Sequence, residues 1–325
     1  MKTNAIRIHQ PGGPEVMVWE EVDLAVPAAG QVLLRHTAVG LNYIDVYHRS
    51  GLYPAPLPFT PGLEGAGVVE AVGDDVTDLK VGDRVAYANP PLGAYAEVRL
   101  MPADRLVKLP DAIDERTAAA MMLQGMTAQY LLRRTYRVQA GDTILIHAAA
   151  GGVGLLVCQW ARHLGATVIG TVGSPEKAEL AKAHGCDHPI LYKSEDFVAK
   201  VREITNGEGV PVVYDSVGKD TFLKSLDCLR PLGMMVSFGQ SSGKVEPLDT
   251  GLLAAKGSLF LTRPSLMAYT AKRSDMLASA GELFDVVEKG VVNIGINQTY
   301  ALKDAPQAHR DLEGRKTTGS TLLLP

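Results

Sequence analysis

From Thr143 onward, short apolar runs alternate with stretches that have helical spacing. This alternation is typical of βαβ units and of a parallel sheet. Strands are predicted at 143–148, 167–172, 189–191, 210–215, 234–238 and 258–262. Helices are predicted at 153–164, 175–184, 197–205 and 221–228, and Pro175 suits the first turn of its helix. The sequence therefore predicts an α/β fold whose doubly wound parallel sheet has the six strands of a dinucleotide-binding (Rossmann) fold.

A glycine-rich turn joins the first of these strands to the first helix. It reads Ala149-x-Gly151-x-x-Gly154, with alanine in the first position of the G-x-G-x-x-G pattern. Small residues are needed because the turn is tight, the backbone must approach a pyrophosphate, and the helix must pack closely on the strand. Amide groups at the helix N-terminus would then meet the phosphates. The pattern alone is weak, but its place before five further strands favours a dinucleotide site over an ordinary turn.

The end of the second strand indicates which dinucleotide is bound. NAD-binding folds usually place Asp or Glu there to hold the ribose hydroxyls. Here the strand ends at Gly173 and Ser174 without a carboxylate, and Lys177 follows one helical turn later. Lys177 could neutralise a 2′-phosphate, so the sequence favours NADPH over NADH. The alternative is that Lys177 is a solvated helix residue between Glu176 and Glu179.

The remaining sequence has the character of an ordinary two-domain globular protein. Its 325 residues are 46% apolar and 21% charged, and the net charge of −4 gives no support for a polyanionic partner. The first third is rich in Gly, Pro and Val with alternating runs at 32–39 and 67–72, which predicts a β-rich domain. A long helix is predicted at 274–288 and a last strand at 319–323.

Cysteine usage and terminal composition favour a cytoplasmic location. Cys158, Cys186 and Cys228 lie far apart without a CxxC pair, which fits reduced core residues better than metal ligands. The first residues contain no continuous apolar segment of the kind found in a signal peptide. The apolar stretch 144–161 carries His147, Gln159 and several glycines, so we expect no membrane span. His147 itself is expected to be a hydrogen-bonded core residue.

The glycine-rich segment also carries a family resemblance. Gly141, Asp142, Leu145, residues 149–152, Gly154, Gln159 and Arg162 match the spacing of the signature of NADPH:quinone oxidoreductases. This is the ζ-crystallin branch of the medium-chain dehydrogenase/reductases, and the chain resembles its bacterial members most. The resemblance extends over almost the whole chain, through residues 62–67, 81–85, 93–97, 213–218 and 262–265. It implies a GroES-like β-rich catalytic domain at 1–125 plus 267–325 and a Rossmann NADPH-binding domain at 126–266.

The same resemblance implies a zinc-free site. Zinc enzymes of the family have a histidine where this chain has Leu63, before Glu64. Residues 40–45, which would supply the first cysteine ligand, contain neither Cys nor His, and no four-cysteine lobe follows Asn89. Catalytic zinc needs three protein ligands and structural zinc needs four. We therefore expect no metal. Without a Lewis acid to stabilise an alkoxide, reduction of a quinone is favoured over oxidation of a simple alcohol.

The expected reaction is NADPH-dependent reduction of a quinone by hydride or one-electron transfer from a nicotinamide in the interdomain cleft. Asn42 would bond the ribose or carboxamide, and Tyr53 is the candidate for orienting the substrate oxygen, although packing is an equal alternative for Tyr53. The resemblance implies cofactor contacts at Asn42, Tyr43, Ile44, Asp45, Val46, Tyr47, Thr127, Tyr130, Gly152, Val153, Gly173, Ser174, Lys177, Tyr192, Ser216, Val217, Phe238, Gly239, Gln240, Ser241, Pro264, Ser265, Leu266 and Arg315.

Two other functions and one assembly remain open. An NADPH-dependent alkenal or enone reductase would use the same fold, and only a comparison of substrates separates it from a quinone reductase. ζ-Crystallin relatives suggest a structural or RNA-binding role, which the near-neutral composition does not support independently. The apolar last strand of the dinucleotide sheet, 258–262, would expose unpaired backbone at a sheet edge. We therefore expect a homodimer that continues the sheet.

Overall fold

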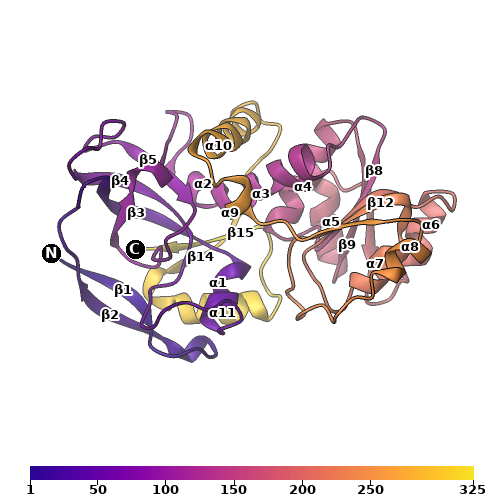
Figure 1. The fold of residues 1–325 in the computed structure, drawn as a ribbon, viewed down its shortest axis with the longest axis horizontal. Helices are drawn as coiled ribbons and strands as arrows, with labels where there is room; N and C mark the ends of the chain where they lie inside the picture. Colours follow the sequence, from indigo (N-terminus) through magenta and orange to yellow (C-terminus); the bar gives the residue numbers. More distant parts are fainter. The chain divides into compact units, whose positions relative to one another are not determined.

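The computed structural model describes residues 1–325, which form two compact units. Unit 1 comprises residues 1–126, 270–288 and 294–325, and unit 2 comprises residues 127–269 and 289–293. Both termini lie in unit 1 (Figure 1). Each unit has its own sheet and its own apolar core, as a domain requires.

Unit 2 is built on a parallel sheet of six strands in the order β10-β9-β8-β11-β12-β13. The strands are β8 (Thr143–His147), β9 (Thr167–Val172), β10 (His188–Leu191), β11 (Val210–Asp215), β12 (Leu229–Ser237) and β13 (Phe260–Thr262). Successive strands first move away from β8 on one side and then on the other, so right-handed crossovers place helices on both faces. This is the predicted doubly wound dinucleotide fold, and β8 and β11 flank the point where the winding reverses.

Helices connect these strands, and four of them lie where the spacing predicts them. The helices are α4 (Gly152–His163), α5 (Pro175–Ala183), α6 (Phe197–Ile204), α7 (Phe222–Asp227), α8 (Gly251–Ala255) and α9 (Leu266–Tyr269). Of these, α8 and α9 are two short helices that were not predicted. Side chains cap two of them: the Ser174 hydroxyl accepts from the Lys177 amide, and the Asp196 carboxylate accepts from the amides of Val198 and Ala199. A π-helical turn, Leu131–Thr135, precedes β8.

Five strand boundaries of unit 2 differ from the prediction: β10 starts and β12 ends one residue earlier than predicted, and the other three differences have conformational reasons. The first strand ends at His147 because Ala148 has a φ of 57°, which starts the glycine-rich turn one residue earlier. The last strand begins only at Phe260, since Ser258 has a φ of 55°. β12 starts at Leu229, earlier than expected, and an irregularity that includes Leu232 at φ 60° interrupts its pairing with β11.

Unit 1 contains a seven-stranded sheet and a separate hairpin. The hairpin pairs β1 (Lys2–Ile8) with β2 (Met17–Asp23). The larger sheet has the order β14-β15-β3-β4-β5-β7, with β6 also paired to β3. Its strands are β3 (Gln31–Leu41), β4 (Glu64–Val72), β5 (Arg84–Ala88), β6 (Val98–Pro102), β7 (Val107–Lys108), β14 (Ile296–Ala301) and β15 (Ser320–Leu324). This is the β-rich domain that the alternating runs predict.

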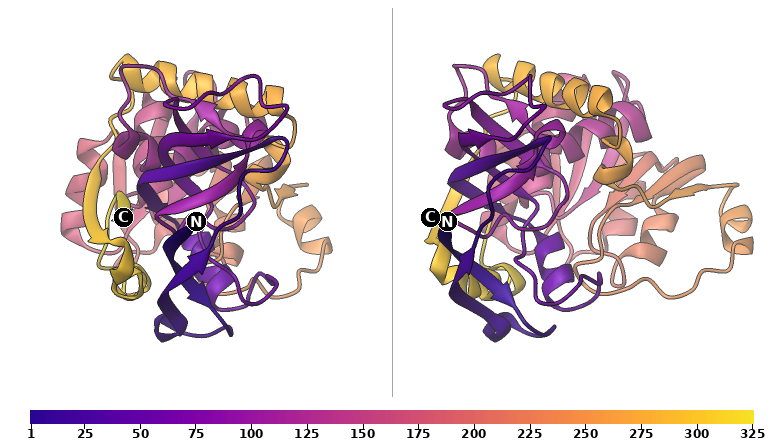
Figure 2. Two further views of the ribbon diagram at one scale, coloured as in Figure 1. Left: turned by 90° about the vertical axis from the view of Figure 1, so that its left-hand side faces the viewer. Right: turned by 60° about the vertical axis from the view of Figure 1, so that its left-hand side comes forward.

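Few helices accompany the strands of unit 1. They are α1 (Tyr43–Arg49), α2 (Glu115–Ala119), α10 (Arg273–Glu288) and α11 (Ala305–Glu313), with 3-10 turns at Pro14–Val16, Ala103–Arg105 and Leu302–Asp304. Figure 2 shows α10, the predicted long helix, crossing above the strands of unit 1 in both views. The helix α3 (Met122–Tyr130) carries the chain from unit 1 into unit 2.

Two expectations about single residues are confirmed. All three cysteines are free and buried. His147 is buried in β8, where its ring nitrogens lie 2.9 Å from the hydroxyls of Thr171 and Ser225.

No helix is long and apolar enough to cross a membrane.

Candidate active site

The glycine-rich turn places the start of α4 at the carboxyl end of β8. The Ala149 amide donates to the Thr171 carbonyl at 3.0 Å, which ties the turn to β9. A methyl group at Gly154 would overlap the carbonyl oxygen of Ala148, so only glycine allows helix and turn to pack this closely. Gly152 and Val153 stand in the first turn of α4, where backbone N–H groups have no partner within the helix. The arrangement suits a phosphate.

The residues predicted to surround the adenosine 2′-phosphate gather at the end of β9. Gly173 and Ser174 follow the strand directly, and Ser174 caps α5 through the Lys177 amide at 3.4 Å. Tyr192 follows the neighbouring strand β10 and donates its amide to the Val172 carbonyl at 3.3 Å. Its hydroxyl packs over Gly173. The structure thus brings the Ser174 hydroxyl, the helix turn that carries Lys177 and the Tyr192 phenol to the end of β9.

Two loops at the carboxyl edge are held together by Asp215, the last residue of β11. One oxygen of this buried carboxylate accepts from the amides of Val217 and Gly218 at 2.7 and 3.0 Å. The other accepts from the hydroxyls of Thr221 and Ser225. The Asp215 carbonyl in turn accepts from the Phe238 amide at 2.8 Å. Asp215 therefore positions both the Ser216–Val217 segment and the start of the Phe238–Ser241 segment.

These two segments also bond to each other. The Ser241 amide donates to the Ser216 carbonyl at 3.1 Å, and the Ser242 amide donates to the Val217 carbonyl at 2.9 Å. Gly239 lies against the Ser216 backbone, where a side chain would collide. The predicted contacts at Ser216, Val217, Phe238, Gly239, Gln240 and Ser241 consequently form one rigid rim.

Stacked aromatic rings link α3 with α9. The rings of Tyr130 and Tyr269 are nearly parallel, with centroids 4.5 Å apart. Thr127 lies one helical turn before Tyr130, and the Ser265 carbonyl begins α9 by accepting from the Ala268 amide at 3.0 Å. This stack places the predicted contacts Thr127, Tyr130, Pro264, Ser265 and Leu266 in one neighbourhood of unit 2.

In unit 1, Asn42 immediately precedes α1 and is only 5% exposed. Its side-chain Nδ2 donates to Glu64 Oε2 at 2.6 Å, and its Oδ1 accepts from Gln124 Nε2 at 3.3 Å. Its backbone amide donates to Asp45 Oδ2 at 3.0 Å. Both carboxyl groups are fully buried, and desolvation raises the pKa of Asp45 to about 7 and that of Glu64 to about 8.

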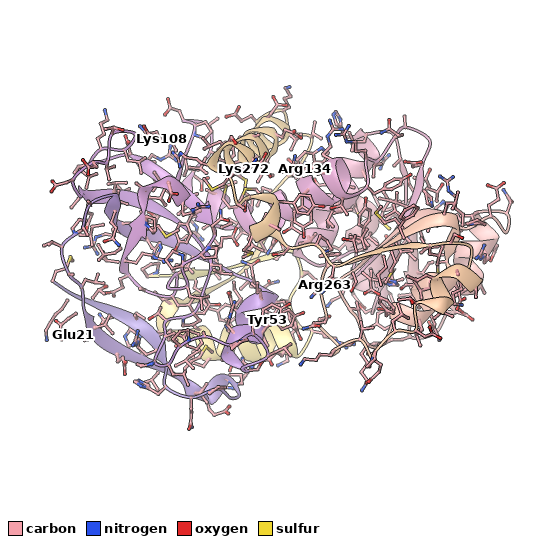
Figure 3. All side chains as sticks on the ribbon, in the orientation of Figure 1. Glu21, Tyr53, Lys108, Arg134, Arg263 and Lys272 are labelled. Carbon is pink, nitrogen blue, oxygen red and sulfur yellow. The ribbon has the colours of Figure 1, made fainter.

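Three tyrosines of unit 1 form an aromatic cluster. The Tyr47 ring lies 5.4 Å from the Tyr43 ring and 5.1 Å from the Tyr53 ring, measured between centroids. Tyr53 lies beside α1 (Figure 3), and its amide donates to the Tyr47 carbonyl at 2.9 Å. Burial raises the pKa of Tyr43, and the Arg315 guanidinium opposes this rise. Arg315 is therefore within electrostatic reach of the cluster.

A chain of hydrogen bonds runs from Arg49 through His309 and Tyr95 to Asp45. Arg49 NH1 lies 2.9 Å from His309 Nδ1, and since arginine only donates, this nitrogen must accept. The other ring nitrogen, Nε2, consequently carries the hydrogen and faces the Tyr95 hydroxyl at 3.0 Å. Tyr95 then donates to Asp45 Oδ2 at 2.9 Å. Burial and Arg49 lower the pKa of His309 to about 3, so this histidine is neutral.

The predicted site residues thus fall into local groups within each unit. Unit 1 brings Asn42, residues 43–47, Tyr53 and Arg315 to the neighbourhood of α1, while unit 2 holds the others at the carboxyl edge of its sheet. Sequence reasoning missed the residues that support them: Asp215, Glu64 and Gln124. Arg263, whose NH1 donates to the Ser237 carbonyl at 2.9 Å, was also missed. Asp215 and Arg263 lie at the carboxyl ends of strands, and this position is the sequence signal from which their supporting role could have been predicted.

The side chains of this structure gather no group of three or more His, Cys, Asp and Glu residues that could hold a metal ion. At the position where zinc enzymes have histidine, Leu63 is buried. Asn42, in the segment that would supply a cysteine ligand, is bonded to Glu64 instead. An amide and a leucine do not form a zinc site.

Comparisons with known proteins agree with this fold and these motifs. Residues 28–111 match the model of the alcohol dehydrogenase GroES-like domain, and residues 152–280 match that of the zinc-binding dehydrogenases. The chain is 55% identical to a quinone oxidoreductase of Pseudomonas aeruginosa over 97% of both chains. It is 52% identical to a 2-haloacrylate reductase of a Burkholderia species over 98% of both.

Solved structures give the same result. The Escherichia coli quinone oxidoreductase, complexed with NADPH, superposes with a TM-score of 0.98. It is 49% identical, and the match covers 99% of this chain and all of that one. With matches of this identity over nearly the full length of both chains, the protein belongs to the quinone oxidoreductase family.

Proposed function

We propose that this chain is an NADPH-dependent quinone reductase that works without a metal ion. The observation that carries this is the set of groups at the end of β9 and the start of α4. Amides of the first turn of α4 suit the pyrophosphate, while Ser174 and Lys177 replace the carboxylate that would select NADH. The family membership supports the same reading, and one relative was solved in complex with NADPH.

Within unit 2, we assign the cofactor to the carboxyl edge of the sheet. Gly152 and Val153 would bind the pyrophosphate, and Gly173, Ser174, Lys177 and Tyr192 would surround the 2′-phosphate. The rim that Asp215 holds in place would line the nicotinamide half, together with Thr127, Tyr130 and residues 264–266. Arg315 of unit 1 would add a further charged contact.

Within unit 1, Asn42, residues 43–47 and Tyr53 would act on the nicotinamide and the substrate. NADPH supplies a hydride or electrons from its nicotinamide ring. The tyrosine cluster offers flat aromatic surface for a quinone and excludes water. Tyr53 would orient the substrate oxygen through its hydroxyl. A quinone spreads the incoming charge over a distant oxygen, so solvent can deliver the remaining proton and no Lewis acid is needed.

A second candidate function is reduction of a conjugated alkene. One relative at 52% identity is named a 2-haloacrylate reductase, and acrylates contain such an alkene. The same positioning residues would serve both substrates, because the fold determines where the cofactor binds more strictly than it determines which substrate is reduced.

The test is a comparison of cofactors and substrates after treatment with EDTA. We expect turnover with NADPH and either 1,4-benzoquinone or 9,10-phenanthrenequinone, and much less with NADH. Activity on 2-chloroacrylate or a simple enone, without activity on quinones, would favour the second candidate. A protein that oxidises neither cofactor with any of these substrates would contradict the proposal.

We also propose a cytoplasmic homodimer. Three free, buried cysteines suit a reducing compartment. The edge strand β13 pairs only with β12, and its Phe260 and Leu261 are 57% and 40% exposed. Pairing of β13 with its copy would cover these side chains and satisfy the free strand edge.

A further inference from the structure

Glu64 is a fully buried carboxylate whose two oxygens both accept hydrogen bonds. Oε1 accepts from the Leu123 amide at 2.7 Å, in the first turn of α3. Oε2 accepts from Asn42 Nδ2 at 2.6 Å. Neither donor belongs to the strand that carries Glu64, so this carboxylate joins β4, α3 and the residue before α1.

The bond from Glu64 decides how the Asn42 amide is oriented. A backbone amide can only donate, and so Oε1 is committed to Leu123. Oε2 then faces the Asn42 side chain and must be met by its NH2 group, which leaves Oδ1 on the side of Gln124. Turning the Asn42 amide over would set its carbonyl oxygen against the Glu64 carboxylate and its NH2 group against Gln124 Nε2. Both contacts would be repulsive when Glu64 is ionised, that is, above its raised pKa of about 8.

Only the ionised carboxylate can perform this role at position 64, because the protonated acid that prevails below about pH 8 carries a donor on one oxygen. A glutamine has the same shape but a single acceptor oxygen, since its nitrogen only donates. It would have to leave either the Leu123 amide or the Asn42 NH2 group without an acceptor. In a fully buried place such a loss is costly.

The space for the carboxylate is made by Gly40 on β3. A methyl group there would overlap both Glu64 Oε2 and the Ala119 carbonyl oxygen. Gly40 pairs with Glu64 across the two strands. The side chain of Glu64 is therefore confined from the strand side and cannot swing away from Asn42.

We propose that Glu64 is a positioning residue: it fixes the Asn42 amide so that the second Nδ2 hydrogen faces the oxygen atoms of the nicotinamide riboside. The inference rests on the proposed function, which assigns Asn42 to that part of the cofactor. Glu64 itself touches neither cofactor nor substrate. Glu64 acts by keeping the NH2 group of Asn42, and not its carbonyl oxygen, on the side that faces the cofactor.

A purely structural role for Glu64 is the competing explanation, because its carboxylate also stabilises the start of α3. The two roles separate in a double-mutant cycle with Glu64→Gln, Asn42→Ala and the double variant. NADPH affinity is measured by quenching of protein fluorescence above pH 8, where Glu64 is ionised, and kcat and KM are measured with 1,4-benzoquinone at the same pH. Glu70→Gln, on the exposed end of β4, is the matched control, and melting temperatures report on folding.

We expect each single variant to weaken NADPH binding by about tenfold, the loss of one hydrogen bond. The double variant should be no weaker than Asn42→Ala alone, since Glu64 acts through Asn42. Glu70→Gln should match the wild type. Losses that multiply to about a hundredfold in the double variant would overturn the proposal.

A second measurement needs neither activity nor a variant at position 64. In ¹⁵N-labelled wild type, the Asn42 NH2 group, assigned by its absence in Asn42→Ala, should show one slowly exchanging hydrogen bonded to Glu64. Two rapidly exchanging hydrogens would overturn the proposal. If the wild type oxidises no NADPH while this hydrogen is protected, the proposed function fails and the positioning of Asn42 stands.

Discussion

At the scale of single residues, two buried carboxyl groups control the surroundings of Asn42. Glu64 accepts a hydrogen bond from the side chain of Asn42, and Asp45 accepts one from the backbone amide of Asn42. Both carboxyl groups are fully buried. Asn42 and Asp45 could be named from the sequence because a family resemblance marks residues 42–47. The role of Glu64 could not, since its partners Asn42 and Leu123 are 22 and 59 residues away. Such pairings depend on strand register, which a single sequence does not specify.

Lys177 provides a test of cofactor choice. Lys177→Ala should weaken NADPH binding about tenfold or more, because one charge-assisted contact to the 2′-phosphate is lost. NADH binding should change little. Dissociation constants for both cofactors are compared with those of Lys182→Ala, an exposed lysine at the end of the same helix. Equal weakening of NADH and NADPH would show that Lys177 does not select the phosphate.

Asp45 makes stability depend on pH. Desolvation raises its pKa from the ordinary value of 3.8 to about 7 in the folded protein. The folded state therefore holds this proton more tightly than the unfolded state, so its stabilising effect is complete below about pH 4 and is lost as pH rises to about 7. Asp45→Asn removes this titration.

The free energy of unfolding, measured by urea denaturation, should thus fall in the wild type relative to Asp45→Asn by about 1.4 kcal/mol per pH unit between about pH 4 and 7. Above that range the difference should be constant. A difference that does not vary across the range would mean that Asp45 is ionised in the folded protein at low pH.

At the scale of elements, the strands and helices of unit 2 follow the sequence pattern closely. The strand that ends at Asp215 was predicted with its correct bounds, because a run of buried residues is bounded by turn residues on both sides. The strand that follows α8 was predicted two residues too long, because the positive φ of Ser258 has no compositional signal. The bonds between the loops after β11 and β12 were not predictable, since they join backbone atoms of segments separated in sequence.

Removal of Asp215 should loosen both loops at once. In Asp215→Ala the amides of Val217 and Gly218 lose their acceptor, which should cost several kcal/mol of stability, at about 1–3 kcal/mol for each unsatisfied buried group. The hydroxyls of Thr221 and Ser225 lose one acceptor but still face the carbonyl oxygens of Gly218 and Thr221. Hydrogen exchange should become faster at residues 216–218 and also at 238–242. Asp215→Asn, which retains one acceptor oxygen, should lie between this variant and the wild type. Faster exchange confined to 216–218 would show that the two loops are independent.

At the scale of the whole molecule, the chain combines a GroES-like β-rich unit with a dinucleotide-binding unit. The sequence predicted this pair of folds because the glycine-rich turn and the family signature are local patterns. The oligomeric state is harder to predict from the sequence, since it depends on which surfaces contact another copy of the chain. The exposed Phe260 on β13 is the structural reason to expect a dimer.

Phe260→Lys should weaken the dimer at least tenfold, because a buried charge would replace an apolar contact at the paired edge. Sedimentation at micromolar concentration measures this. Leu223→Lys, at an equally exposed leucine on α7, should leave the dimer intact. A wild type that sediments as a monomer of 34.7 kDa would contradict the assembly.

The most direct test of metal-free NADPH:quinone reduction is an anaerobic single turnover. EDTA-treated protein, shown by elemental analysis to contain no zinc, is mixed with NADPH and 1,4-benzoquinone, and both products are counted. We expect one hydroquinone formed per NADPH oxidised, with a slower rate when C4 of the nicotinamide carries deuterium. Turnover that disappears with the metal, or no oxidation of NADPH at all, would contradict it.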